Sequence, residues 1–245
     1  MGIKVTMAPK WTSLLSQEIE KDYFQALLSF LTEEYAKDHV VPSKDNVFKP
    51  FRLTDYDKVK VVIIGQDPYP GAGQANGLAV GVPDDFYPKP KTFGEIIKEL
   101  CVGLWKSGRY TNALDPLFDI KGSSMEGWAQ QGVLMLNACL TTEKGKPKAH
   151  RGKGWERFVT RALKYLGEQE NRIVFIAWGE EAKTLLSSAD VNRNGHHLIL
   201  TSGHPSPLAA RAKKPFSGCD HFNKANAFLS SHGIQPIDWI KISSH

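Results

Sequence analysis

Three side chains with different chemical abilities each lie at or just after the end of a short apolar run. Asp67 follows the run KVVIIG, Asn137 lies near the end of the run GVLMLNA, and His204 follows the run HLILTSG. A carboxylate can stand opposite a developing cation, an amide offers both donors and an acceptor, and a histidine titrates close to neutral pH. These residues are therefore the first candidates for chemistry in this chain.

Each candidate also has a purely structural interpretation. Asp67 precedes a proline and could cap a turn, and Asn137 could satisfy free backbone groups at a strand end. His204, also before a proline, could be a packed and hydrogen-bonded histidine. The functional interpretation is favoured because all three residues take the same place relative to an apolar run.

The apolar runs themselves predict a parallel sheet. They occupy residues 60–65, 132–138, 172–179 and 197–203, and none alternates cleanly with polar residues. That pattern is typical of strands buried on both faces. Because ligands of open parallel sheets bind outside the carboxyl ends of the strands, we expect the three candidate side chains in one cleft there.

Helical patterns lie between and before the apolar runs. They cover residues 92–105, 154–169 and 180–188, and residues 11–35 form one or two further helices. The alternation of strand and helix predicts an α/β fold, in which a central four-stranded parallel sheet is flanked by helices.

We expect the whole chain, residues 1–245, to form a single domain. Its core motifs span residues 59–239, and an N-terminal helical segment at about 11–40 packs on that core. The composition, 41% hydrophobic and 23% charged, is that of an ordinary globular protein.

Cysteine usage and charge exclude several other classes of protein. Three cysteines lie far apart without a CxxC pair, which argues against a zinc site or a disulfide framework and fits a reducing compartment. No apolar run is long enough to span a membrane and no secretory signal is present, so we expect a cytoplasmic protein, or a nuclear one in a eukaryote. A net charge of +5 permits a polyanionic partner, and basic residues gather in predicted loops at 144–154 and 211–214.

Longer motifs around the candidate residues carry a family resemblance. The segments GQDPYP (65–70), LNA (136–138) and GHPSPLAA (203–210) resemble the signature segments of the uracil-DNA glycosylase family, in its family 1 branch. The similarity runs from about Leu14 to Trp239. It implies a DNA repair enzyme that flips uracil out of DNA and hydrolyses its N-glycosidic bond, leaving an abasic site, with no metal and no cofactor. The implied partner is uracil-containing DNA, single- or double-stranded. No strong oligomer signal appears in the sequence, so we expect a monomer, and we expect no membrane partner.

The resemblance implies a role for each residue of a uracil pocket. Asp67 positions and polarises the attacking water, and His204 donates a hydrogen bond to uracil O2 as negative charge develops there. Asn137 reads the O4 and N3 edge of the base, and the Gln66 backbone adds a further contact. Tyr69 fills the space that a thymine methyl group would need. Asp67 and His204 are thus the expected catalytic residues.

The resemblance also implies the DNA contacts. Ser206 contacts a phosphate beside the uracil, and Leu208 inserts into the space that the base leaves, although a leucine folded back on the core is the alternative. Thr92 stands near the position of a family serine in a Pro-Pro-Ser loop. In the RAKKP stretch (211–215) that follows Leu208, we expect the basic side chains to contact the DNA backbone: Arg211, Lys213 and Lys214.

One position departs from the family pattern in a way that affects function. Family members commonly have an aromatic ring that stacks on uracil, and this chain has Val80 there. Because such a stack contributes roughly 1–3 kcal/mol, its loss supports a second hypothesis, a catalytically weak protein that binds uracil-containing or damaged DNA. The presence of Asp67 and His204 favours an active enzyme. An unrelated nucleotide-binding α/β protein is disfavoured, because neither of the common phosphate-binding glycine motifs occurs.

Overall fold

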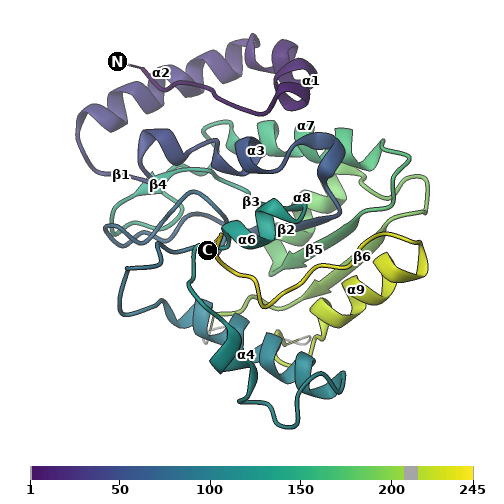
Figure 1. Ribbon diagram of the computed structural model, residues 1–245. Helices are drawn as coiled ribbons and strands as arrows, with labels where there is room; N and C mark the ends of the chain where they lie inside the picture. The colour runs from purple at the N-terminus through teal and green to yellow at the C-terminus, as the bar shows by residue number, and fades with distance from the viewer. Residues whose placement is uncertain (1, 207–214, 245) are drawn as a thin grey trace.

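A four-stranded parallel sheet forms the centre of the molecule (Figure 1). The structure is a computed structural model that describes residues 2–206 and 215–244. The strand order is β3-β2-β5-β6, and each neighbouring pair is parallel. The strands are β2 (Val61–Gly65), β3 (Val133–Asn137), β5 (Val174–Trp178) and β6 (Leu198–Ser202). Each strand coincides with one of the apolar runs, and the predicted fold class is confirmed.

Alternate side chains of the strands are buried against two separate layers of helices. On β2, Val62 and Ile64 belong to one apolar cluster, whereas Val61 and Ile63 belong to the other. All four side chains are fully buried, which is why this strand is apolar at every position. β6 differs, because it is an edge strand that the helices cover incompletely. Ile199 on β6 is 36% exposed, so the prediction of burial on both faces is wrong for this strand.

One layer of helices lies above the sheet in Figure 1 and contains the N-terminal helices. Its members are α1 (Pro9–Ile19), α2 (Asp22–Ala36), α3 (Lys49–Leu53), α7 (Trp155–Gly167) and α8 (Glu180–Ala189). Residues 11–35 thus contribute to two helices, and α7 and α8 agree with the predicted helices before and after β5.

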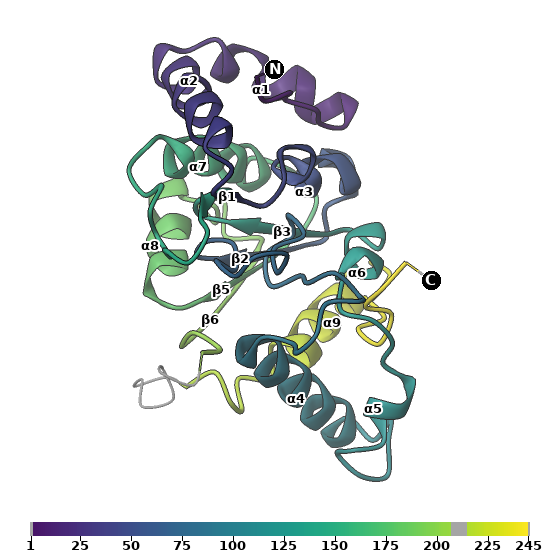
Figure 2. The same cartoon turned by 90° about the vertical axis from the view of Figure 1, so that its left-hand side faces the viewer.

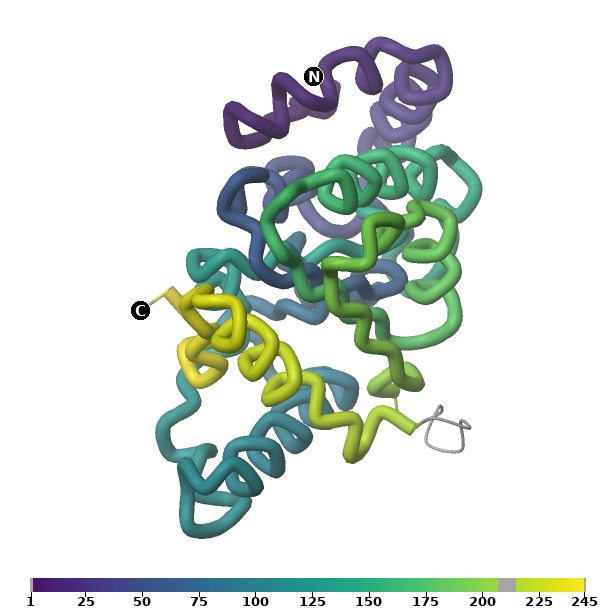
Figure 3. The backbone as a smooth tube through the Cα atoms, turned by 90° about the vertical axis from the view of Figure 1, so that its right-hand side faces the viewer, coloured from purple at the N-terminus to yellow at the C-terminus, as the bar shows by residue number. Residues whose placement is uncertain are grey.

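The opposite layer lies below the sheet, where α4 and α9 run side by side (Figures 2 and 3). Its members are α4 (Lys91–Lys106), α5 (Pro116–Asp119), α6 (Glu126–Gln130) and α9 (His221–Ser231). Of the helices in the described part of the chain, none is both long enough and apolar enough to cross a membrane.

A small antiparallel ribbon, which the sequence does not predict, lies apart from the main sheet. It consists of β1 (Val40–Val41) and β4 (Thr142–Glu143), and short 3-10 turns follow β1 (Lys44–Asn46) and α3 (Tyr56–Lys58). Strands of two residues leave no periodic signal in a sequence. The ribbon fixes the start of the basic loop that follows β4, the stretch 144–154.

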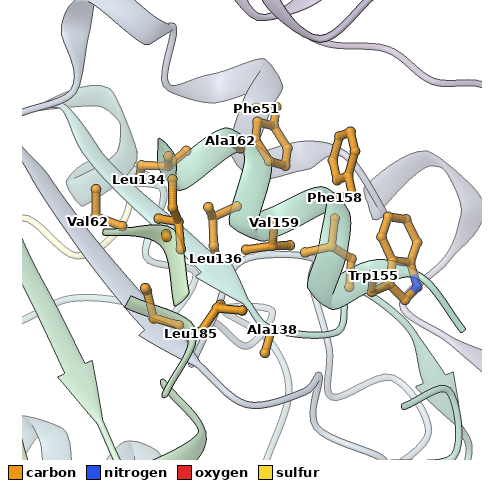
Figure 4. Packing of buried hydrophobic residues seen from close by; sticks show 14 of the residues in the cluster. Phe51, Val62, Leu134, Leu136, Ala138, Trp155, Phe158, Val159, Ala162 and Leu185 are labelled. Carbon is orange, nitrogen blue, oxygen red and sulfur yellow. The ribbon is translucent and has the colours of Figure 1, made fainter. Parts of the chain in front are cut away.

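An aromatic layer fills the space between the N-terminal helices and α7, and Figure 4 shows part of it. Its members, all at most 1% exposed, are Trp11, Phe24, Phe48, Phe51, Trp155 and Phe158. The Phe158 ring lies near the centre, with its centroid 4.9 Å from that of Phe24 and 5.6 Å from that of Phe51. Most ring pairs meet edge to face, the arrangement that aromatic quadrupoles favour.

Candidate active site

A cavity of about 400 Å³ lies at the carboxyl ends of the parallel strands, where the sequence predicts a ligand cleft. This volume falls within the range of small-molecule sites. The cavity is lined by every described residue that the sequence predicts to bind uracil or DNA: Gln66, Asp67, Tyr69, Val80, Thr92, Asn137, His204 and Ser206. The other predicted DNA contacts lie outside the described residues: Leu208, Arg211, Lys213 and Lys214.

The abrupt end of β2 makes room for an amide group. Gly65, the last residue of β2, lies opposite Asn137, the last residue of β3. A Cβ atom at Gly65 would overlap the Asn137 Oδ1 atom, so the close approach of this amide to the strand end requires glycine. Asn137 is only 4% exposed and lines the cavity, so it offers its donors and its acceptor to a ligand.

Asp67 lies partly buried where the chain leaves β2. Its Oδ2 atom accepts a hydrogen bond from the backbone N–H of Lys148, with 2.9 Å between nitrogen and oxygen. Burial raises the pKa of the Asp67 carboxyl above its usual value, and the Lys148 N–H and ammonium group act in the opposite direction. The hydrogen bond fixes one carboxylate oxygen at the edge of the cavity.

His204 is held in one tautomer by the loop that follows it. The backbone N–H of Ser206 donates to the His204 Nδ1 atom at 3.0 Å. A nitrogen that accepts a hydrogen bond carries no proton, so in the neutral ring the proton is on Nε2. Burial lowers the pKa of the His204 imidazole, which favours the neutral ring. His204 is therefore suited to act as an uncharged hydrogen-bond donor.

Tyr69 and Val80 form apolar parts of the cavity wall. The Tyr69 hydroxyl is buried without a hydrogen-bond partner in the described structure, and burial raises its pKa, so it stays protonated. Val80 has a φ of 59°, an unfavourable conformation for a β-branched residue. Phe86 and Phe93, the first two phenylalanines after Val80 in the chain, are not among the residues that line this cavity. Neither ring therefore replaces the aromatic stack that Val80 lacks.

A second cavity of about 350 Å³ adjoins the first and shares Gln66 and Asp67 with it. Its lining includes Lys148 and Glu181, two residues that the sequence analysis did not single out. The Glu181 carboxylate contacts the Lys148 ammonium group at 2.8 Å. A signal for Glu181 exists, because the third apolar run ends in the segment WGEE at the same sheet edge. Lys148 is marked only by its place in the basic stretch 144–154.

One cluster outside the cavity has the residue types of a metal site. Glu34, His39 and Glu143 have potential ligand atoms within 4.8 Å of one another. These atoms already pair within the protein. Glu34 contacts Lys37 at 2.6 Å and His39 at 2.7 Å, and Glu143 contacts Lys146 at 2.7 Å. Because a lysine already balances each carboxylate, the cluster is an ion-pair network near α2 and β4.

Comparison with known proteins gives one consistent family. The family model described as the uracil DNA glycosylase superfamily matches residues 51–230. The chain is 41% identical over 237 residues to a uracil-DNA glycosylase of Phocaeicola vulgatus, covering 97% of this chain and 100% of the relative. It is 39% identical over 236 residues to one of Porphyromonas gingivalis, covering 96% and 99%. Among solved structures, mimivirus uracil-DNA glycosylase aligns with a TM-score of 0.81 and 30% identity, covering 95% of this chain and 87% of that chain.

Proposed function

The chain belongs to the uracil DNA glycosylase superfamily, and we propose how the residues of its cavity carry out the reaction of that family. The enzyme takes uracil out of the DNA stack, hydrolyses the bond between base and deoxyribose, and leaves an abasic site for base excision repair. The observation that carries the proposed mechanism is that Asp67, Asn137 and His204 line one cavity at the sheet edge.

Asn137 selects the base through its amide. Uracil presents the O4 acceptor beside the N3–H donor, and an amide can pair with both at once. Cytosine has an amino group in place of O4, so a donor would meet a donor and buried polar groups would stay unpaired. Tyr69 excludes thymine by filling the space that its methyl group needs. The pocket therefore accepts uracil and rejects both normal pyrimidines of DNA.

His204 stabilises the leaving base. Negative charge develops on uracil as the glycosidic bond breaks, and the Nε2–H donor of His204 is aimed at O2. The Ser206 N–H keeps the proton on Nε2 by occupying Nδ1. A donor in such a position stabilises the transition state by roughly 3–4 kcal/mol in other enzymes.

Asp67 acts on the sugar side of the same bond. As an ionised carboxylate it stabilises the cationic character of the deoxyribose and orients the water that attacks it, as carboxylates do in glycoside hydrolysis. The Lys148 N–H supports this role, because a hydrogen bond to a carboxylate favours its ionised form.

The DNA backbone is held at the mouth of the cavity. Ser206 and Thr92 line the cavity and contact phosphates, which sets the register of the DNA without reading its sequence. Leu208 fills the space of the extruded base. Three basic side chains beyond it add salt-dependent affinity: Arg211, Lys213 and Lys214. Action on both single- and double-stranded DNA, a monomeric state and a cytoplasmic or nuclear location stay predictions.

The test of the proposed function is base release from three matched oligonucleotides that differ only in one uracil, thymine or cytosine. The expected result is free uracil from the first and no base from the other two. A protein that binds the uracil oligonucleotide without releasing the base would instead be the weak damage-binding protein that Val80 suggests. Release of thymine or cytosine at a comparable rate would contradict the roles of Tyr69 and Asn137.

A further inference from the structure

The loop that holds Asp67 has an unfavourable backbone conformation. Lys148, which donates its N–H to the Asp67 Oδ2 atom at 2.9 Å, has a φ of 67°. A residue with a Cβ atom is strained there by about 1–2 kcal/mol relative to its ordinary conformations. Thr142 holds the loop on both sides of Lys148 through the Ala149 N–H and the Lys146 carbonyl. The strained residue between them needs contacts of its own to keep its N–H on the carboxylate.

Glu181 supplies such contacts from a rigid element. It lies in the first turn of α8, directly after β5, where the helix dipole favours a negative charge. Its Oε1 atom contacts the Lys148 Nζ atom at 2.8 Å and the Arg151 guanidinium at 3.2 Å. One carboxylate on a helix thus binds two side chains of the loop, that of the strained residue Lys148 itself and that of Arg151 further along the chain.

We propose that Glu181 is a positioning residue for catalysis, which holds Lys148 so that its N–H stays on the Asp67 carboxylate. This proposal rests on the proposed function of Asp67. The ion pairs are partly exposed, since the side chains of Glu181, Lys148 and Arg151 are 29%, 46% and 57% accessible. Such pairs contribute little to global stability. Here they affect only the local equilibrium between a loop whose Lys148 N–H lies on Asp67 and a loop whose N–H is turned away. A small free energy is sufficient to shift that equilibrium.

A simpler role for Glu181 makes the opposite predictions. If it only neutralised two cations near the DNA, its removal would tighten DNA binding and leave the chemical step unchanged. If it positions Lys148, its removal slows the chemical step at saturating DNA. The two roles are therefore separated by measuring the rate and the affinity in parallel.

The experiment uses the full chain with the substitution Glu181→Gln. We expect single-turnover uracil release from a saturating single-stranded oligonucleotide to fall about tenfold, ~1.4 kcal/mol. Affinity for the matched thymine oligonucleotide is unchanged or tighter. The Lys148 amide, followed by hydrogen exchange in NMR spectra, exchanges faster than in the unaltered protein, because it has lost its fixed acceptor.

The matched control is Glu180→Gln. Glu180 is the neighbouring residue in the same helical turn. Its carboxylate is exposed and pairs with the Lys183 ammonium group of the same helix. Its replacement removes the same charge but leaves rate, affinity and Lys148 exchange as they were. An unchanged rate or an unchanged Lys148 exchange in Glu181→Gln overturns the proposal. The exchange measurement needs no activity, so it decides the positioning role even if the protein released no uracil.

Discussion

The aromatic layer and the cavity at the strand ends are built in opposite ways. In the aromatic layer the rings are fully buried, and the polar atoms of its indoles are paired. Trp11 Nε1–H donates to the Thr54 carbonyl at 2.9 Å, and Trp155 Nε1–H donates to Thr141 Oγ1 at 2.7 Å. Every group in this layer has a partner, as expected of a region that stabilises the fold.

The cavity departs from these rules at several places. Val80 in the cavity wall and Lys148 in the adjoining cavity both have left-handed backbone conformations, and the Tyr69 hydroxyl is buried without a partner in the described structure. Asp67 is a partly buried carboxylate whose pKa is raised by that burial. These exceptions lie where a ligand is expected to complete the site, and comparable ones occur elsewhere in the described structure, at Met125 and at the His150 Nε2 atom. The comparison teaches that stability and chemistry depend on different residues, and each can be changed alone.

The largest expected effect is at Asp67. Asp67→Asn keeps the size of the side chain and an acceptor for the Lys148 N–H but removes the charge. We expect uracil release to fall by at least 10³-fold, while DNA affinity and melting temperature change little. Single-turnover assays and fluorescence anisotropy measure the two quantities. A variant with most of its activity would show that the charge is not needed.

A substitution in the aromatic layer should lower stability and leave the chemistry unchanged. Phe158→Ala removes the central ring, and we expect the free energy of unfolding to fall by about 3–5 kcal/mol. In a chain of this length that lowers the melting temperature by roughly 6–20 °C. The rate per folded molecule at low temperature stays unchanged. Leu114→Ala is the control, since Leu114 is 67% exposed and its loss should have almost no effect on stability. Loss of rate without loss of stability in Phe158→Ala would remove the distinction between the two regions.

The pH dependence of uracil release follows from the cavity alone. In the proposed mechanism the active form has Asp67 ionised and His204 neutral, so we expect the rate to fall as the pH drops and either group gains a proton. Burial raises the pKa of Asp67 above about 3.9 and lowers that of His204 below about 6.5. The raised carboxyl pKa sets a lower bound: the acid midpoint lies above about pH 3.9, with about a tenfold loss per pH unit just below it as the first group gains a proton. A midpoint below about pH 3.9 would contradict a buried Asp67 carboxyl.

The smallest expected effect is a gain at Val80. Val80→Phe supplies the missing aromatic face, and the left-handed backbone disfavours phenylalanine no more than the β-branched valine that it replaces. We expect a fall in apparent KM of up to about fivefold, near the lower end of a base–aromatic stack. Val80→Ala, which adds no ring, is the control, and its KM should not fall below that of the unaltered protein. A higher KM in Val80→Phe would show that the cavity has no room for a stacking ring.

The sequence predicts the fold and the placement of the candidate site for one physical reason. A strand buried on both faces must be apolar throughout, so the strands are visible as runs such as residues 61–65. Parallel strands end at one edge, so Asp67, Asn137 and His204 are brought together by topology alone. Each of these predictions depends on residue type and order, which the sequence states directly.

Other features depend on the assembled structure. The donor to Asp67 is the backbone N–H of Lys148, and a backbone group has no signature in residue type. The left-handed conformation of Val80 contradicts the local preference of valine. The exposure of Ile199 follows from the incomplete cover of β6 by helices, since β3, the other edge strand, is fully buried. In each case tertiary contacts override what local sequence favours.

The most direct test of the central claim compares four proteins on one single-stranded uracil oligonucleotide: the unaltered chain, Asp67→Asn, His204→Leu and the double variant. Both side chains are proposed to act on the two sides of one breaking bond. We therefore predict that each single change lowers the single-turnover rate at least 100-fold while DNA affinity is retained. The fold-loss of rate in the double variant should be smaller than the product of the two single fold-losses. Full activity in either single variant, or rate losses that only follow weaker DNA binding, would contradict the account.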